Sequence, residues 1–147
     1  MAFLFTLEAV LRYRRSLEDQ EQLVLRTTLL RRSTVLQQQE RLRKERAELR
    51  ESLQRTLSQA VLPAADLQLC VLRGQSMQLA EEQLVLTLRQ LQSEIEAQRV
   101  RYQAERQRRE ALESLRDAQM RNYEVLRKRR EQSILDELYL LRRHREL

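Results

Sequence analysis

The sequence predicts an all-α protein: a long two-helix antiparallel coiled-coil hairpin, with room for a short helix at the bend. Three observations support this class. The 147 residues include one glycine and one proline, and strong helix formers such as Leu, Arg, Glu and Gln fill most positions. Apolar residues recur at steps of three, four and seven, which is a coiled-coil rhythm. The proline and the glycine bracket a single interruption, where the chain can reverse direction.

The first long helix is expected over residues 1–60. Thr6 is a candidate N-cap, and Glu8 lies in the first turn, where a carboxylate interacts favourably with the helix dipole. Apolar residues then repeat at seven-residue spacing: Leu17 with Val24, and Val35 with Leu42 and Leu49. In the same register, polar residues stand where apolar ones are expected: Arg14, Glu21, Thr28 and Gln38. We hypothesise that they weaken the pairing and set its register; the alternative is that they are solvated positions of an amphipathic helix.

The bend is expected over residues 61–75. Pro63 lacks an amide donor and ends the first helix. The stretch "AADLQLCVLR" that follows is apolar enough to form a short helix across the bend. The second long helix is expected over residues 76–147, so the whole chain is interpreted as a single hairpin. A parallel homodimer of two continuous helices is the competing arrangement.

Charge is distributed unevenly along the chain. The net charge is +6, made up of +4 in residues 1–50, −3 in residues 51–98 and +5 in residues 99–147. Folding at the bend brings both basic ends together. The run "RKRR" at residues 127–130 is interleaved with acidic residues, which is typical of a solvated helix face with internal ion pairs. We therefore expect an acidic protein partner and no nucleic acid.

A group of apolar residues stands near the C-terminus. Residues 134–141 contain six large apolar side chains around Asp136 and Glu137. If Ala60 faces Gln75, the numbers of paired residues add to about 135, and Met1 lies opposite Ile134. Residues from about 134 onward then have no partner within the chain. Exposed apolar groups of this kind usually mark an interaction site, so a docking surface is predicted there.

Signals of catalysis or of a bound cofactor are missing from the sequence. His144 is the single histidine, Cys70 is the single cysteine, and no cluster has metal-ligand spacing. A two-helix rod offers no concave pocket, so no enzyme activity, no cofactor and no metal are expected. No apolar run is long enough to span a bilayer, which predicts a soluble, cytoplasmic protein without a transmembrane segment.

Both ends of the chain resemble the bacterial flagellar FliJ family. The stretch "FLFTLEAVLRYRRSLEDQEQ" (residues 3–22) is similar to the start of these proteins. The stretch "EALESLRDAQMRNYEVLRKRREQSILDELYLLRRHR" (residues 110–145) is similar to their C-terminal signature, an "LE.L" element, a basic helix and then "EQ...LDE". Ser114 replaces a charged residue of that signature. The two stretches cover a little over a third of the chain.

The resemblance implies a stalk protein of the flagellar type III export apparatus. The open end of such a hairpin enters the pore of a hexameric export ATPase and promotes its assembly and activity. The rod also contacts the cytoplasmic part of the membrane export gate and binds export chaperones. It implies a monomer when free, peripherally associated with the inner membrane at the flagellar base. Carried onto this chain, the expected ATPase contacts are Leu4, Leu7, Leu11, Arg14, Arg130, Leu135, Asp136, Glu137 and Leu138. The expected gate contacts, chosen by their place near the bend, are Leu72, Met77 and Leu79.

Three other interpretations of the sequence stay open at this point. One is a stalk homologue from an injectisome-type secretion system. Another is a structural coiled-coil scaffold that self-associates through its terminal apolar residues. The third is a nucleic-acid-binding helical protein.

Overall fold

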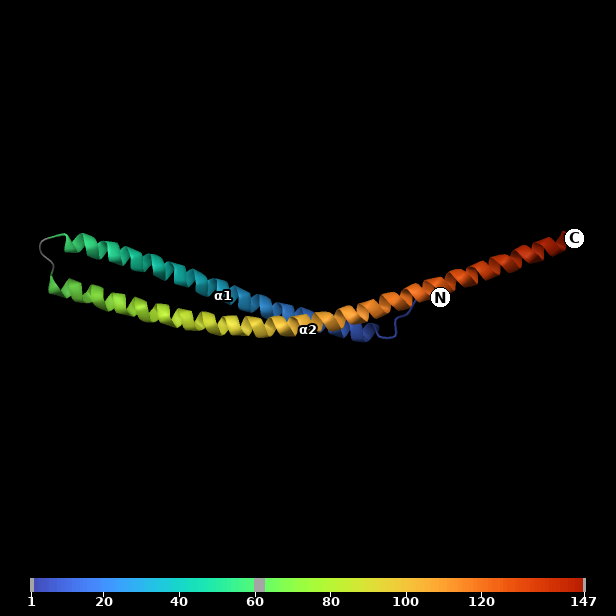
Figure 1. Cartoon of the computed structure of the whole chain (residues 1–147), viewed down its shortest axis with the longest axis horizontal. Helices are drawn as coiled ribbons and strands as arrows, with labels where there is room; N and C mark the ends of the chain where they lie inside the picture. Colours follow the sequence, from blue (N-terminus) through green and yellow to red (C-terminus); the bar gives the residue numbers. More distant parts are fainter. Residues whose placement is uncertain (1, 60–62, 147) are drawn as a thin grey trace. The chain divides into compact units, whose positions relative to one another are not determined.

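Two long helices make up the structure. The computed structural model describes residues 2–59 and 63–146. Helix α1 spans Glu8–Leu57 and helix α2 spans Ala64–Arg145, and the residues described contain no strand. The helices pack against each other as a helical hairpin, which confirms the predicted fold class (Figure 1).

At the start of each helix, backbone carbonyls accept hydrogen bonds from amides of the first turn, and each first turn also contains a carboxylate. In α1, Glu8 lies in the first turn, and the N–H of Leu11 donates to the carbonyl of Leu7 at 2.9 Å. Leu7, and not the expected Thr6, therefore opens the helix. In α2, the carbonyl of Pro63 accepts the N–H groups of Asp66 at 3.1 Å and of Leu67 at 3.3 Å. Pro63 thus opens α2, whereas α1 ends earlier, at Leu57, and not at the proline as expected.

The predicted start of the second helix is wrong. Helix α2 begins at Ala64, not near Ser76, and Gly74 lies inside it without a positive φ. A glycine in a helix interior costs about 1 kcal/mol relative to alanine, which is too little to interrupt a helix supported on both sides. The segment expected to form a separate short helix, residues 64–73, is therefore the first part of α2.

Tertiary contacts group the chain into two compact units, and each is described separately. The bend-end unit comprises Glu21–Tyr102, and the open-end unit comprises Met1–Gln20 and Gln103–Leu147. Within the bend-end unit, α1 and α2 lie side by side (Figure 1). Its buried apolar side chains are Met77, Leu91 and Ile95.

The row of α1 side chains that is buried or half-buried forms a seam with three- and four-residue steps. Its members are Glu8, Leu11, Arg14, Glu18, Glu21, Leu25, Thr28, Arg32, Val35, Gln39, Leu42, Arg46, Leu49, Leu53 and Thr56. The polar residues predicted at seam positions are there at Arg14, Glu21 and Thr28. Val24 and Gln38 were misplaced by one residue, because both are exposed while Leu25 and Gln39 are half-buried.

Charged pairs show how the helices are aligned in each unit. Glu18 binds Arg109 in the open-end unit, and Arg46 binds Glu81 in the bend-end unit; in both pairs the residue numbers add to 127. The sequence predicted that the numbers of paired residues add to about 135, so the predicted alignment differs from the observed one by about one seven-residue repeat. The error follows from the early start of α2. The two pairs named from that count, Met1 with Ile134 and Ala60 with Gln75, each include a residue outside the described part of the chain.

Candidate functional site

The C-terminal part of α2 extends past the N-terminal end of the chain within the open-end unit. All residues of this part, 124–146, are exposed, and we call it the tail. The last half-buried residue before it is Tyr123. Figure 1 shows the tail continuing as a single helix beyond the N-terminus. The unpartnered region therefore starts about ten residues before the predicted position 134.

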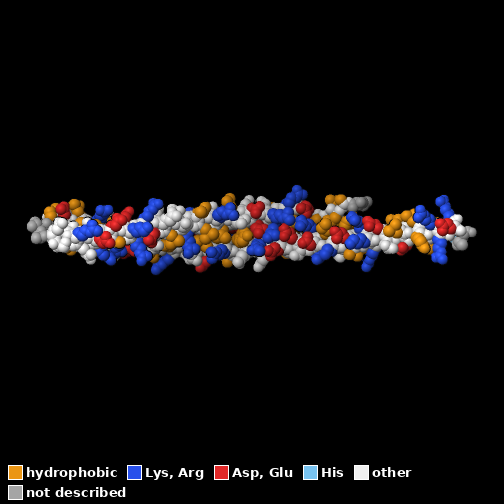
Figure 2. Space-filling model, turned by 90° about the horizontal axis from the view of Figure 1, so that it is seen from above, with side chains coloured by type: hydrophobic (Ala, Val, Ile, Leu, Met, Phe, Trp, Pro, Cys, Tyr) orange, Lys and Arg blue, Asp and Glu red, His pale blue; other side chains and the backbone are white. Residues whose placement is uncertain are grey.

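Apolar side chains lie on the surface of the tail. Ile134, Leu138 and Leu141 follow four- and three-residue steps, so they share one face of the helix, and they are 56%, 55% and 65% exposed. Further exposed apolar side chains of the tail are Val125, Leu126, Leu135, Tyr139 and Leu140. Figure 2 shows apolar side chains among basic ones at this end of the molecule. A face of this kind normally requires a partner in order to be buried.

The N-terminal segment packs beside the base of the tail. The rings of Phe3 and Tyr123 lie 5.6 Å apart, and Phe5 is buried. Leu4, between the two phenylalanines, is 86% exposed, and Leu7 is partly exposed. Phe3 and Phe5 thus anchor this segment, while Leu4 between them faces solvent.

A network of ion pairs joins the two helices of the open-end unit. Arg109 of α2 binds Glu18 of α1 and also donates to Glu113 at 2.7 Å. Arg15 of α1 donates to the same Glu113 at 3.0 Å, which closes a chain of four alternating charges. Arg14 lies 3.5 Å from Glu105. Glu18 is only 9% exposed, and the guanidinium of Arg109 supplies the hydrogen bonds that a carboxylate in such a place needs.

The network shifts two pKa values. The hydrogen bond to Glu18 raises the pKa of Arg109, against an opposing effect of burial, and the charges of Glu18, Glu113 and Glu110 raise it further. The hydrogen bond from Arg15 lowers the pKa of Glu113, again against burial, with help from the positive charge of Arg109. Both shifts favour the charged forms, which is how an ion-pair network differs from isolated buried charges.

A family comparison gives this geometry a context. The family model described as Flagellar FliJ protein matches residues 3–147. The chain belongs to the flagellar FliJ family. Neither a search of curated proteins nor a search of solved structures found a match. Membership makes this FliJ-family chain an export-associated stalk protein of the flagellum.

Most of the residues expected to contact the ATPase are accessible in this FliJ-family structure. On the tail, Arg130, Leu135, Asp136, Glu137 and Leu138 are all exposed. Asp136 accepts a hydrogen bond from the Gln132 side chain, one helical turn earlier on the same helix, at 3.0 Å.

The expected contacts on α1 and before it divide into two groups. Leu4 and Leu7 are exposed, whereas Leu11 has no exposed surface and belongs to the packing between the helices. Arg14 is half-buried and engaged with Glu105. Leu11 and Arg14 therefore belong to the contact between the helices. The accessible surface at this end of α1 is formed by other residues, among them Leu4 and Leu7.

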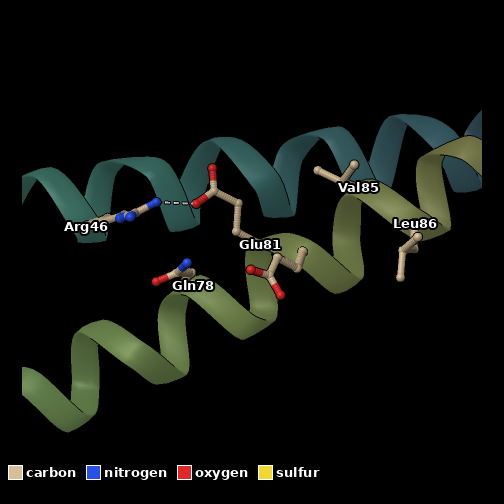
Figure 3. Close-up of a pocket in the computed structure, with 6 residues that line it drawn as sticks. Arg46, Gln78, Glu81, Val85 and Leu86 are labelled. Atoms are coloured by element: carbon tan, nitrogen blue, oxygen red, sulfur yellow. Dashed lines mark hydrogen bonds and ion pairs between the residues drawn. The ribbon is translucent and has the colours of Figure 1, made fainter.

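The residues expected to contact the export gate are also divided. Leu72 and Leu79 are exposed on α2, and Met77 is buried against α1 in the bend-end unit. A shallow groove, wide open to solvent, lies nearby, with Arg46, Gln78, Glu81, Glu82, Val85 and Leu86 around it. Figure 3 shows Arg46 reaching across to Glu81, and Leu86 pointing away from α1. The groove is a feature of the helix pair's surface and not a ligand cavity.

Sequence reasoning missed residues 124–133 as part of the unpartnered surface. The signal was in the sequence, because Pro63 is followed by helix formers with no further proline and the second helix could have been started there. Within the described residues, no group of three or more potential ligands lies close enough to hold a metal ion. None of the described helices combines the length and the hydropathy that a membrane span requires.

Proposed function

We propose that this FliJ-family chain is a non-enzymatic stalk whose open end binds the hexameric flagellar export ATPase and promotes its assembly and activity. The observation that carries the proposal is the tail, a single helix in which every residue from 124 to 146 is exposed, so that six large apolar side chains within residues 134–141 have no helix of this chain to pack against. A lone helix is narrow, about 10–12 Å across with its side chains, which suits insertion into the opening of a ring. ATP hydrolysis belongs to the partner.

Both apolar and charged residues of the tail contribute to the proposed binding. Burying Leu135 and Leu138 favours association by about 1.5–3 kcal/mol each before ordering costs. The basic run at residues 127–130 attracts an acidic rim and orients the approach of the tail. Because such attraction is screened by salt, the binding rate should fall as ionic strength rises.

The other contacts of the proposed stalk are with the export gate and with export chaperones. The exposed pair Leu72 and Leu79, separated by two helical turns on α2, offers a surface for the cytoplasmic part of the gate protein. Contact with the gate would hold the chain at the inner membrane peripherally. These contacts rest on the family and on exposure, and the chaperone surface has no residue assigned to it.

Stimulation of ATP hydrolysis tests the proposal. The purified chain should stimulate the flagellar ATPase of the same cell, and Leu135→Asp or Leu138→Asp should reduce that stimulation at least about tenfold, because a carboxylate cannot be buried unpaired. Leu23→Asp and Leu30→Asp are matched controls, since both leucines are similarly exposed on α1 in the bend-end unit. Absence of stimulation by the unaltered chain over a wide concentration range would refute the stalk function.

A self-associating scaffold is the competing function, and the exposed apolar tail is the observation that favours it. Analytical ultracentrifugation separates the two. The stalk proposal expects a monomer at micromolar concentration, whereas a stable dimer that Leu138→Asp dissociates would favour the scaffold. Stimulation of an injectisome ATPase in preference to the flagellar one would indicate that the chain functions in that related secretion system.

A further inference from the structure

The apolar residues of the two helices do not select one alignment by themselves. Coiled-coil seams repeat every seven residues, so sliding one helix by seven positions again faces seam against seam. In the observed alignment Phe3 meets Tyr123. A shift of seven towards the C-terminus raises the sum of paired residue numbers from 127, the value for the two charged pairs, to 134, and this places Leu11 opposite Tyr123, which is also an apolar match. The alignment must therefore be selected by something other than apolar spacing.

Charged residues in the seam distinguish the observed alignment from its neighbours. Arg15 meets Glu113, Glu18 meets Arg109, and Arg46 meets Glu81. A shift of seven towards the C-terminus would place Arg15 opposite Met120 and Arg46 opposite Leu88. Glu81 would then lose its cation, and Glu113 would keep only Arg109 of its own helix. Glu18 alone would keep an arginine, Arg116, in that alignment. The shifted alignment is less stable because half-buried charges would face apolar side chains.

The opposite shift is excluded more strongly. It would place Arg15 opposite Arg106, which is a pair of like charges. Glu18, which is nearly buried, would face Tyr102 in the middle of the helix pair. Like-charge contacts and unpaired buried carboxylates both destabilise a helix pair. The observed alignment is thus the one in which Arg15, Glu18 and Arg46 each meet a residue of opposite charge on α2.

We propose that the ion-pair network centred on Glu18 and Arg109 acts as a register lock that sets how much of α2 projects as the tail. Each seven-residue shift would lengthen or shorten the tail by about 10 Å, at 1.5 Å per residue. Glu18, Arg109, Arg15 and Glu113 are therefore positioning residues: they touch no partner, and they fix the place of the residues that do. The role of the tail rests on the proposed function, but the register claim itself does not.

A distance measurement tests the register directly. Ser16 on α1 and Ser133 on the tail are both exposed and belong to the same unit, so each can carry a spin label after replacement by cysteine in a Cys70→Ser background. The unaltered seam should give one distance in pulsed electron paramagnetic resonance. Arg109→Glu, which puts two carboxylates together, should add a population displaced by about 10 Å. The double variant Glu18→Arg with Arg109→Glu should restore the single distance.

The controls separate register from stability and from function. Arg121→Glu makes the same charge change on the exposed side of α2 and should leave the distance unchanged. If Arg109→Glu loses helix content, the pair Glu18→Gln with Arg109→Gln decides, because it removes both charges and leaves neutral polar side chains in their place. A single unaltered distance in a folded Arg109→Glu or in that double variant would overturn the register lock. Failure of the unaltered chain to stimulate the ATPase, together with a displaced population in Arg109→Glu, would instead count against the proposed function and leave the register lock standing.

Discussion

Arg109 and Glu18, ninety-one positions apart in the sequence, are joined by two hydrogen bonds across the interface between α2 and α1. The second of these bonds, from Nη2 of Arg109 to Oε1 of Glu18, is 3.3 Å long. Glu18 is nearly buried, and the arginine also binds Glu113. The pair occupies a position that a regular coiled coil fills with an apolar contact. At this position the two helices therefore recognise each other by charge instead of by apolar packing.

Removing Arg109 should destabilise the hairpin more than removing an exposed arginine. Arg109→Leu leaves Glu18 without its cation, and we expect a loss of about 1 to 3 kcal/mol, since the site is not fully desolvated. Arg127→Leu, which breaks an exposed pair with Glu131 on the tail, should cost less than about 0.5 kcal/mol. Urea unfolding followed by circular dichroism measures both. The double variant Glu18→Leu with Arg109→Leu should recover the loss; if it is no more stable than Arg109→Leu, the buried charge is not the cause.

Acid should weaken the open-end unit through Glu113. Its pKa in the folded chain is lowered by Arg15 and Arg109, so its contribution to stability is present above the unfolded pKa of about 4.3 and is lost as the pH falls through the lower folded value. Melting temperatures recorded between pH 7 and pH 2 should therefore fall at the acidic end. Glu113→Gln should melt lower at pH 7 and should lose part of that acid dependence. An unchanged acid dependence in Glu113→Gln would contradict the assignment.

Gly74 is a weak point that can be repaired. It lies inside α2, and a Cβ added there would meet no atom within 4 Å. Gly74→Ala should therefore stabilise the chain by about 0.5 to 1 kcal/mol, because alanine has the higher helix propensity and loses less conformational entropy on folding. Ala80→Gly, at an exposed position of the same helix, is the reverse control and should destabilise by a similar amount. If Gly74→Ala destabilises instead, α2 needs flexibility at that point.

The fold class could be predicted from the sequence because one glycine and one proline leave no alternative to long helices. The alignment of the helices could not, because it depends on where α2 starts and on which charges meet. The prediction treated Gly74 as a helix breaker, and the expected sum of paired residue numbers was therefore too high by about one heptad. The tail was nonetheless found, since residues 134–141 lie beyond the partner helix in either alignment. The burial of Leu11 and Met77 could not be foreseen, because it depends on the exact seam.

The central claim, that the tail is the surface presented to the export ATPase, is tested most directly by deleting its apolar part, residues 131–147. A chain that ends after Arg130 keeps every described residue of α1 and the whole ion-pair network. We predict that its melting temperature stays within about 3 °C of the full chain, because an unpartnered helix end contributes little to global stability, while stimulation of the ATPase is lost. Full stimulation of the ATPase by this shortened chain would contradict the account.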